Sequence, residues 1–319
     1  MNQDIYFLIE HLQGQVADIS YITLAAARDL AQETGGKVLG VLLGQNAQEL
    51  ASTLAADSIL YADHPALAEF TSDAYQKTVA SLIGENEPRV VLFGNTSIGA
   101  DVASVLSARL SLPLVSSCVK TSGGKLTSQI CGGKIMAESE LAETTTLITV
   151  IPGGYKSESG QSETAPEVIS FDAPALDDLR VTLKGYIEPE AGDVDISKES
   201  ILIAIGRGIQ TEDNIELAEE LAELLGGEVC ASRPVVDQGW LPTSRMVGKS
   251  GQTVKPRLYL ALGISGAPEH VEGMTDSETI VAVNMDPNAP IFDVATYGVE
   301  FDFFDLIDPL LEQLKGAKG

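Results

Sequence analysis

The chain has 319 residues, a length that favours two domains over one. Lysine and arginine number 20 while aspartate and glutamate number 46, so the formal net charge is −26, which argues against nucleic acid or any other polyanion as a partner. Hydrophobic residues make up 44% of the chain and charged residues 21%, a balance that predicts a globular, soluble protein rather than a disordered one.

The cysteines and the N-terminus indicate the compartment. Cys118, Cys131 and Cys230 are odd in number and none stands in a C-x-x-C spacing, so we expect no disulfide framework, zinc site or iron–sulfur cluster. The N-terminal segment lacks the features of a signal peptide, and no apolar run is long enough to cross a bilayer. We therefore expect a cytoplasmic protein that is not embedded in a membrane.

The first part of the chain alternates short apolar runs with amphipathic stretches. We expect strands over 5–11, 37–44, 58–63 and 89–95, and helices over 17–34, 47–56, up to about 86, and 99–111. Such alternation predicts a parallel sheet with right-handed crossovers. From about residue 117, serine, threonine, glycine and lysine mix with β-branched residues, and this texture predicts antiparallel strands added to the sheet, one of them within 144–155.

A linker follows this first domain. Between residues 154 and 200 only 168–173 and 179–187 are candidates for strands, and the acidic segment 188–200 is typical of a linker. We place the boundary between an N-terminal domain, 1–194, and a C-terminal domain, 195–319. In the second domain the alternation resumes, with strands expected over 201–206, 228–232, 258–263 and 279–284 and helices over 211–225 and 302–315. It predicts another parallel, Rossmann-like α/β domain.

Three glycine loops of the second domain are candidates for holding a phosphate, because ligands of open parallel sheets bind beyond the carboxyl ends of the strands. Gly206-Arg207-Gly208 begins a G-x-G-x-x-G pattern but has Thr211 at the third glycine position, so a simple turn is an equal alternative. Gly248-Lys249-Ser250-Gly251 lacks the first glycine of a P-loop. The loop 263–267 stands between an apolar strand and Pro268, which is the context expected for a diphosphate.

Two further side chains flank these loops. His270 follows Pro268 by half a turn and could point toward the loop's ligand, although a lone histidine is more often an ordinary surface or capping residue. Arg233 follows the strand at 228–232, and Pro234 after it predicts an extended backbone there. In so acidic a chain its guanidinium is either part of a salt bridge or a partner for an anion.

Four segments of the second domain carry a family resemblance. The segments ASRPVVDQGWLP (231–242), VGKSG (247–251), LYLALGISGAPEHVEGM (258–274) and IVAVNMDPNAPIFDVATYG (280–298) resemble, in order and spacing, the FAD domain of the electron transfer flavoprotein alpha subunit. The first domain resembles the same family less specifically, for example at 98–104.

The resemblance implies a non-covalently bound FAD in the second domain and a heterodimer with an electron transfer flavoprotein beta subunit, for which the first domain is scaffold and subunit interface. The protein would be an electron carrier rather than an enzyme. It would take electrons from flavin dehydrogenases, such as acyl-CoA dehydrogenase, and pass them to a downstream acceptor, such as a quinone oxidoreductase.

The resemblance also assigns roles to residues. Arg233 would lie against the isoalloxazine ring, Ser250 would hydrogen-bond flavin N5, and His270 would lie near the C2 carbonyl oxygen. The residues at 265–267 would follow the diphosphate. The full set of FAD-binding positions that it implies is Arg207, Ser232, Arg233, Val247, Gly248, Lys249, Ser250, Ser265, Gly266, Ala267, Pro268, Glu269, His270, Asn284, Asp302 and Phe303.

The sequence departs from the family at several of these positions. Lys249 and Glu269 stand where the family usually has glutamine, Ser250 where it has threonine, Thr296 where it has aspartate, and Ile151 where arginine is common. These differences leave the flavin potential and the choice of donor open.

Three alternatives stay open at this point. The chain could belong to a bifurcating or Fix-type complex that oxidises NADH, which Arg233-Pro234 and Gly239-Trp240 favour weakly and the beta subunit would decide. It could be an NAD-dependent Rossmann-like enzyme, although Thr211 breaks the fingerprint and three histidines supply no clear acid–base cluster. It could be a regulatory protein that binds an adenine nucleotide in its first domain, although the loop 94–97 is short and unspecific.

Overall fold

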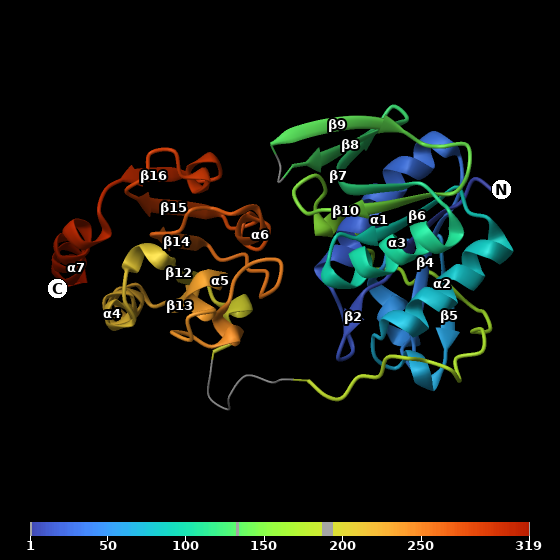
Figure 1. The fold of residues 1–319 in the computed structure, drawn as a ribbon, viewed down its shortest axis with the longest axis horizontal. Helices are drawn as coiled ribbons and strands as arrows, with labels where there is room; N and C mark the ends of the chain where they lie inside the picture. Colours follow the sequence, from blue (N-terminus) through green and yellow to red (C-terminus); the bar gives the residue numbers. More distant parts are fainter. Residues whose placement is uncertain (1, 132–133, 187–193, 319) are drawn as a thin grey trace. The chain divides into compact units, whose positions relative to one another are not determined.

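The structure is a computed structural model that describes residues 2–131, 134–186 and 194–318 (Figure 1). The chain forms two compact units, residues 1–185 and residues 186–319. Each unit is built around one mainly parallel sheet, which confirms the expected pair of α/β domains. The expected boundary after residue 194 falls slightly later than this division, and the intervening residues 187–193 lie outside the described ranges, so the boundary stays a prediction.

The sheet of unit 1 has nine strands in the order β11-β5-β4-β1-β6-β10-β7-β8-β9. The strands are β1 (Ile5–Leu8), β4 (Val38–Gly44), β5 (Ser58–Asp63), β6 (Val90–Gly94), β7 (Leu114–Ser122), β8 (Lys125–Ile130), β9 (Ile135–Glu140), β10 (Thr146–Val150) and β11 (Glu167–Ser170). A short hairpin of β2 (His11–Leu12) and β3 (Gln15–Val16) follows β1. Strands β11 through β7 run parallel, and β8 and β9 add to the edge in antiparallel fashion.

Three of the expected elements differ in the structure. Strand β10 is parallel to both its neighbours rather than antiparallel, and its five residues are all buried, as is typical of a central parallel strand. Residues 47–56 form only a short 3-10 helix, Gln48–Thr53, instead of an α-helix. The described part of 179–187 forms no strand. Arg180 there is held by a carboxylate rather than by a sheet edge.

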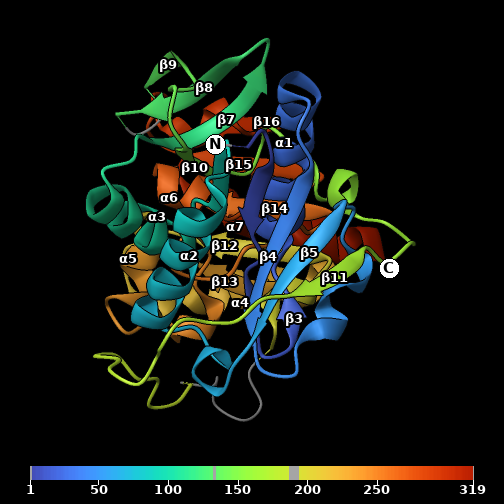
Figure 2. The same cartoon turned by 90° about the vertical axis from the view of Figure 1, so that its right-hand side faces the viewer.

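Helices cover both faces of the first sheet (Figure 2). Helix α1 (Asp18–Thr34) packs on one face, and α2 (Ser72–Asn86) and α3 (Ser97–Leu110) pack on the other. Strand β1 alternates between the two cores, because Ile5 and Phe7 contact the α1 side while Tyr6 and Leu8 contact the α2 and α3 side. The buried thiol of Cys118 belongs to the α1 core.

The segment after β11 runs along unit 1 without regular structure and is fastened at Arg180. Its guanidinium donates to both carboxylate oxygens of Asp73 in α2, at 3.1 and 2.7 Å, and its backbone N–H donates to the same carboxylate at 2.8 Å. These bonds hold the pKa of Asp73 at about 2, well below its ordinary value. Leu176, just before, is buried against the α2 and α3 core.

Unit 2 has a five-stranded, wholly parallel sheet in the order β13-β12-β14-β15-β16. The strands are β12 (Ile201–Ile205), β13 (Glu228–Ala231), β14 (Leu258–Leu262), β15 (Thr279–Asn284) and β16 (Tyr297–Glu300). Two long helices, α4 (Ile215–Leu225) and α7 (Phe303–Lys318), contact each other and cover one face. Two single-turn helices, α5 (Arg233–Val236) and α6 (Pro268–Val271), stand in the loops.

The strand order of unit 2 fixes where its ligand site lies. Strand β12 has β13 on one side and β14 on the other, so the chain reverses its direction of progress at β12. In doubly wound sheets, ligands bind beyond the carboxyl ends of the strands at this point of reversal. Those ends carry the loops 206–210 and 263–267, two of the three glycine loops identified in the sequence.

Unit 1 has an equivalent point of reversal, between β1 and β6, and a carboxyl group of the protein lies there. Glu10, which follows β1, is almost fully buried and accepts hydrogen bonds from the hydroxyl of Thr96 at 2.8 and 3.0 Å. Thr96 is the N-cap of α3 and also accepts from the N–H of Gly99. A Cβ on Gly94 or Gly99 would lie within 3 Å of the Glu10 carboxyl, so this crevice is packed.

Glu10 makes the stability of the protein depend on pH. Burial raises its pKa from 4.5 to about 7, so the folded state binds this proton more tightly than the unfolded state does. The free energy of unfolding therefore falls as pH rises through the range 4.5 to 7, by at most about 3 kcal/mol. Glu10→Gln removes this titration, and its stability relative to the wild type should rise from pH 5 to pH 7 and then level off, as measured by urea unfolding at each pH.

Glu85 in α2 is exposed and serves as the control, because Glu85→Gln makes the same substitution outside the core. The Glu85→Gln variant should keep a constant difference from the wild type across this range. A Glu10→Gln difference that is equally constant would contradict a raised Glu10 pKa.

Candidate functional site

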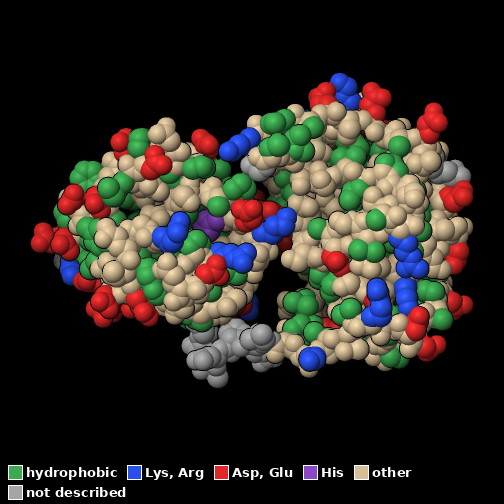
Figure 3. All heavy atoms as spheres, viewed as in Figure 1, with side chains coloured by type: hydrophobic (Ala, Val, Ile, Leu, Met, Phe, Trp, Pro, Cys, Tyr) green, Lys and Arg blue, Asp and Glu red, His purple; other side chains and the backbone are tan. Residues whose placement is uncertain are grey.

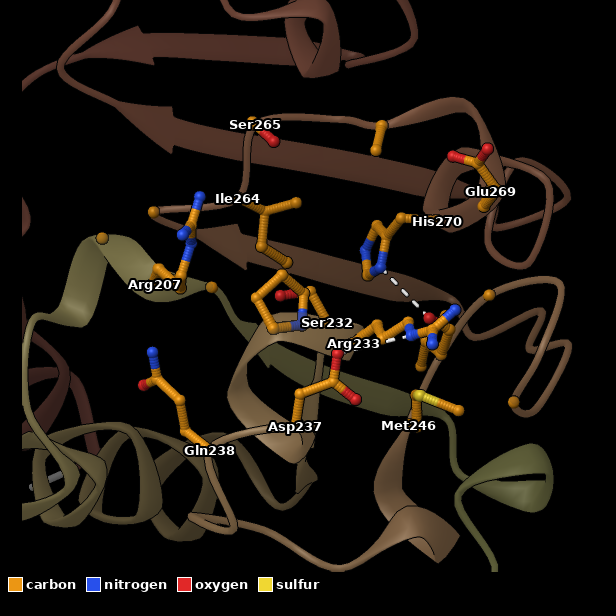
Figure 4. Close-up of a pocket in the computed structure, with 18 of the residues that line it drawn as sticks. Arg207, Ser232, Arg233, Asp237, Gln238, Met246, Ile264, Ser265, Glu269 and His270 are labelled. Carbon is orange, nitrogen blue, oxygen red and sulfur yellow. Dashed lines mark hydrogen bonds and ion pairs between the residues drawn. The ribbon is translucent and has the colours of Figure 1, made fainter. Parts of the chain in front are cut away.

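A pocket of 780 Å³ lies at the carboxyl ends of β12, β13 and β14 (Figure 4). Its volume is in the range of about 300–1,000 Å³ that is usual for cofactor sites. The residues that line it are Gly206, Arg207, Gly208, Gln210, Ser232, Arg233, Pro234, Asp237, Gln238, Trp240, Met246, Val247, Gly248, Lys249, Ser250, Gly251, Gly263, Ile264, Ser265, Ala267, Glu269, His270 and Asn284. All of them belong to unit 2.

The floor of the pocket depends on contact between two glycine loops. The N–H of Gly206 donates to Leu262 O at 2.9 Å, and the N–H of Gly208 donates to Gly263 O at 3.1 Å. A Cβ on Gly206 would lie 2.2 Å from Gly263 O, and one on Gly208 would lie 2.5 Å from Gly263 Cα. The loops therefore meet backbone to backbone, which only glycine allows at these positions.

The loop after β14 offers unpaired backbone donors. Within the described residues, the N–H groups of Ser265, Gly266 and Ala267 have no protein acceptor. Gly266 has a φ of +85°, and its backbone lies so close to Ile291 that a Cβ would be 2.2 Å from Ile291 N. The Asn284 amide donates to Ile264 O at 2.8 Å and ties this loop to the end of β15. Such a series of free N–H groups fits an anionic group such as a diphosphate.

A second wall is formed by the segment 246–251. It runs beside the end of β13, where Val247 N–H donates to Ala231 O at 2.9 Å. Lys249 N–H donates to Glu269 O at 2.7 Å, which joins this segment to α6 across the pocket wall. These bonds hold Lys249 and Ser250 along the pocket without any regular helix or strand.

The charge of the lining contrasts with the acidity of the whole chain. Arg207, Arg233 and Lys249 supply three cations against two carboxylates, Asp237 and Glu269. Figure 3 shows basic side chains gathered on the face of unit 2 where a histidine appears. Three cations beside unpaired N–H groups fit a phosphate-bearing cofactor.

Two of these cations have partners in the protein. Arg233 Nε lies 3.4 Å from an Asp237 carboxylate oxygen, and the Arg233 side chain is 69% exposed. Lys249 Nζ lies 3.6 Å from a Glu272 carboxylate oxygen. The expected extended backbone at Arg233 is wrong, because α5 begins there, with Ser232 as its extended N-cap. The extended residue is the N-cap itself, and Pro234 stands in the first turn, where a proline is tolerated.

His270 is part of the pocket wall but is only 6% exposed. Its Nε2 lies 2.9 Å from the hydroxyl of Tyr259, and its Nδ1 lies 3.2 Å from Val247 O. Burial lowers the pKa of His270 to about 4, so the ring is neutral at physiological pH. His270 is neither a surface residue nor a source of positive charge in the pocket.

Most of the positions proposed from the sequence line this one pocket. Gly266 and Pro268 lie between lining residues of the loop after β14. Asp302 accepts the N–H of Phe304 at the start of α7, and Phe303 is 4% exposed within the core beneath α7. Neither Asp302 nor Phe303 is part of the lining. A role in FAD binding stays a prediction for the whole set.

The pocket also contains residues that the sequence did not suggest as ligands. Gly206, Gly208 and Gly263 stood in loops already identified, and their glycine identity was the available signal. Gln238 and Trp240, by contrast, come from the irregular chain after α5. Such residues have no periodic pattern, so only their place in the fold reveals them.

Two kinds of feature are absent from the described ranges. No group of histidine, cysteine and carboxylate side chains there could hold a metal ion. No helix in these ranges has the length and apolar composition required to cross a bilayer.

The fold and pocket define a protein whose second α/β unit is built to hold a phosphate-bearing dinucleotide. Family models match both units: an electron transfer flavoprotein domain over residues 5–176 and an electron transfer flavoprotein FAD-binding domain over residues 195–275. The chain belongs to the electron transfer flavoprotein alpha subunit family, and its cofactor is FAD.

Individual relatives match over nearly the whole chain. The electron transfer flavoprotein subunit alpha of Thermoanaerobacterium thermosaccharolyticum is 36% identical over 326 residues, which cover 99% of both chains. That of Bacillus subtilis is 34% identical over 322 residues, covering 99% of this chain and 98% of the relative. A lactate dehydrogenase (NAD(+),ferredoxin) subunit LctC of Acetobacterium woodii is 31% identical over 328 residues, covering 98% of this chain and 77% of the relative.

The contact between the glycine loops can be tested at Gly263. This residue has a φ of +63°, and a Cβ added to it would lie 2.6 Å from Gly208 Cα. Gly263→Ala should lower both the urea stability of the chain and its FAD content. Gly226→Ala is the matched control, because Gly226 has a similar φ of +73° but no neighbouring atom within 4 Å of its Cβ position. The control should lose only about 1 kcal/mol from backbone strain, and Gly263→Ala at least about 2 kcal/mol more. Equal losses in the two variants would contradict the close contact.

Proposed function

We propose that this chain holds FAD in the pocket of unit 2 and, paired with an electron transfer flavoprotein beta subunit, carries electrons from a flavin dehydrogenase to a downstream acceptor. The donor would be of the acyl-CoA dehydrogenase type and the acceptor a quinone oxidoreductase. The observation that carries the proposal is that the unpaired N–H groups at 265–267 and three cations lie in one pocket of 780 Å³.

The residues divide the work between the two ends of the cofactor. The N–H groups of Ser265, Gly266 and Ala267 are suited to the diphosphate. By family resemblance, Arg233 and Ser250 are assigned to the flavin. When bound, FAD supplies a group that takes up and releases electrons. A guanidinium near that group favours added negative charge, and the neutral His270 adds none.

A carrier role is favoured over an enzymatic one by what surrounds the pocket. His270 is buried with both ring nitrogens engaged, so it is a poor candidate for proton transfer to a substrate. Arg233 and Asp237, by contrast, are exposed, so this side of the pocket faces solvent. A flavin that exchanges electrons with partner proteins requires such access.

A second candidate is the alpha subunit of a complex that oxidises NADH and divides its electrons between two acceptors. The similarity to LctC, a subunit of a lactate dehydrogenase that uses NAD(+) and ferredoxin, favours it. The two candidates share the FAD pocket of this chain. They differ in the beta subunit and in the response to NADH.

The proposed function is tested by producing the chain together with its beta subunit and measuring FAD per heterodimer after extraction. We expect one FAD per heterodimer, bound by this chain. An Arg207→Glu, Lys249→Glu double variant should lose it, because both substitutions place carboxylates beside the anionic diphosphate. A folded complex that binds no FAD, even when FAD is added, would contradict the proposal. Reduction of a second flavin by NADH would select the second candidate.

Arg233 should set the potential at which the flavin takes up its first electron. An exposed charge at contact distance, about 4 Å, contributes about 1 kcal/mol, which corresponds to about 40 mV for one electron. Arg233→Ala should therefore lower this potential by about 40 mV in spectroelectrochemical titration, and Arg233→Lys should recover part of the shift. Arg257, exposed and at the amino end of β14, is the control, and Arg257→Ala should shift it far less. Equal shifts in the two alanine variants would show that Arg233 does not act at the flavin.

A further inference from the structure

Beneath the pocket, one buried side chain of the sheet reaches His270. Tyr259 of β14 is completely buried, and its hydroxyl lies 2.9 Å from His270 Nε2. The thiol of Cys230, in β13, is buried on the same face of the sheet. The strand between them, β12, has the small Ala204 opposite Cys230. Tyr259, Ala204 and Cys230 belong to one core cluster on this face of the sheet.

The chemistry of its two partners fixes the direction of each hydrogen bond of His270. A backbone carbonyl can only accept, so His270 Nδ1, 3.2 Å from Val247 O, must carry a hydrogen. In a neutral imidazole the other nitrogen, Nε2, is then an acceptor. The Tyr259 hydroxyl therefore donates to Nε2.

The same reasoning gives the opposite tautomer for the other two histidines. His11 Nε2 lies 2.7 Å from Leu43 O and must be the protonated nitrogen. His64 Nδ1 accepts the N–H of Ala66 at 3.1 Å, so its hydrogen is on Nε2 when the ring is neutral. The chain has three histidines in total, and His270 alone is held in the Nδ1–H form.

We propose that Tyr259 is a positioning residue of the FAD pocket: its hydroxyl holds His270 in one orientation as the neutral Nδ1–H tautomer. The inference deepens the proposed function and rests on it for the identity of the ligand. With Val247 O and Tyr259 occupying both ring nitrogens, His270 meets the cofactor without a free N–H. Donation to the flavin C2 oxygen would require one of these two bonds to break.

The surroundings of His270 agree with this role. The ring is buried in a wall whose charged neighbours are Lys249, Glu269 and Glu272, and Lys249 is paired with Glu272 at 3.6 Å. Burial lowers the pKa of the imidazole to about 4. The positive charge that faces an anionic ligand is therefore left to Arg207, Arg233 and Lys249, while the Tyr259 hydroxyl keeps the intervening ring fixed.

The tautomer is tested directly by nitrogen-15 NMR of the histidine rings in the full chain. We expect one ring with a protonated Nδ1 and an unprotonated Nε2, assigned to His270 by its loss in His270→Gln, and a hydrogen on Nε2 of His11 and of His64. A protonated Nε2 on His270 would overturn the proposal. This measurement needs neither FAD nor a Tyr259 variant, so it stands if either fails.

Tyr259→Phe tests the role of the hydroxyl. We expect the Nε2 resonance of His270 to move toward the position of a lone pair without a donor while Nδ1 stays protonated, and FAD affinity to fall about fivefold, the loss typical of one buried hydrogen bond. Tyr75→Phe is the control, because Tyr75 is equally buried and its hydroxyl bonds Leu43 O at 3.2 Å in unit 1. The control should leave the His270 resonances and FAD affinity unchanged.

The outcomes separate the two proposals. An unchanged Nε2 resonance in Tyr259→Phe would overturn the positioning role even if FAD binds well. An Nε2 shift together with unchanged FAD affinity would overturn the role of Tyr259 in the pocket. Absence of FAD binding in the wild-type complex would contradict the proposed function, while the wild-type tautomer would still report on the hydrogen bonds of His270.

Discussion

The pocket of unit 2 depends on one close contact, the backbone-to-backbone approach of the loops after β12 and β14. Gly206 and Gly208 pack against Gly263 at distances that leave no room for a Cβ. This approach brings the ends of the two central strands together at the point where the sheet reverses its direction. The loop 263–267 then keeps unpaired N–H groups, and the cations of neighbouring segments gather around them. Without the contact, the N–H groups and the cations would lie on loops that do not meet.

The point of strand reversal is filled in unit 1 and left open in unit 2. At the reversal point of unit 1, the buried Glu10 and the capping Thr96 satisfy each other and pack against glycine backbone. At the reversal point of unit 2, glycine backbone is again in close contact, but the polar groups beyond it are left for a ligand. One sheet arrangement therefore serves as a packed scaffold in one unit and as a binding site in the other, and the difference lies in a few loop residues.

The parts of the fold that the sequence predicted well are those with a periodic signal. Helix α1 and strands β12, β14 and β15 follow directly from their apolar patterns, and the loops at 206 and 263 from their glycines. Strand β10 was assigned the wrong direction because a buried β-branched run is compatible with either pairing. The core position of the Phe303 side chain follows from no motif, and its role in FAD binding stays a prediction. The partners of His270 come from distant segments, and no local pattern encodes them.

The distribution of cysteines gives each unit its own internal reporter. Cys118 is buried in the core of unit 1 and Cys230 in that of unit 2, and burial raises the pKa of both thiols, to about 11 and about 12. Thiols in this state react with alkylating reagents only when the surrounding core opens. Cys131 is exposed and reacts without such opening. The rates at which a thiol reagent modifies Cys118 and Cys230 in the native chain would thus measure the opening of the two cores separately, without any engineered label.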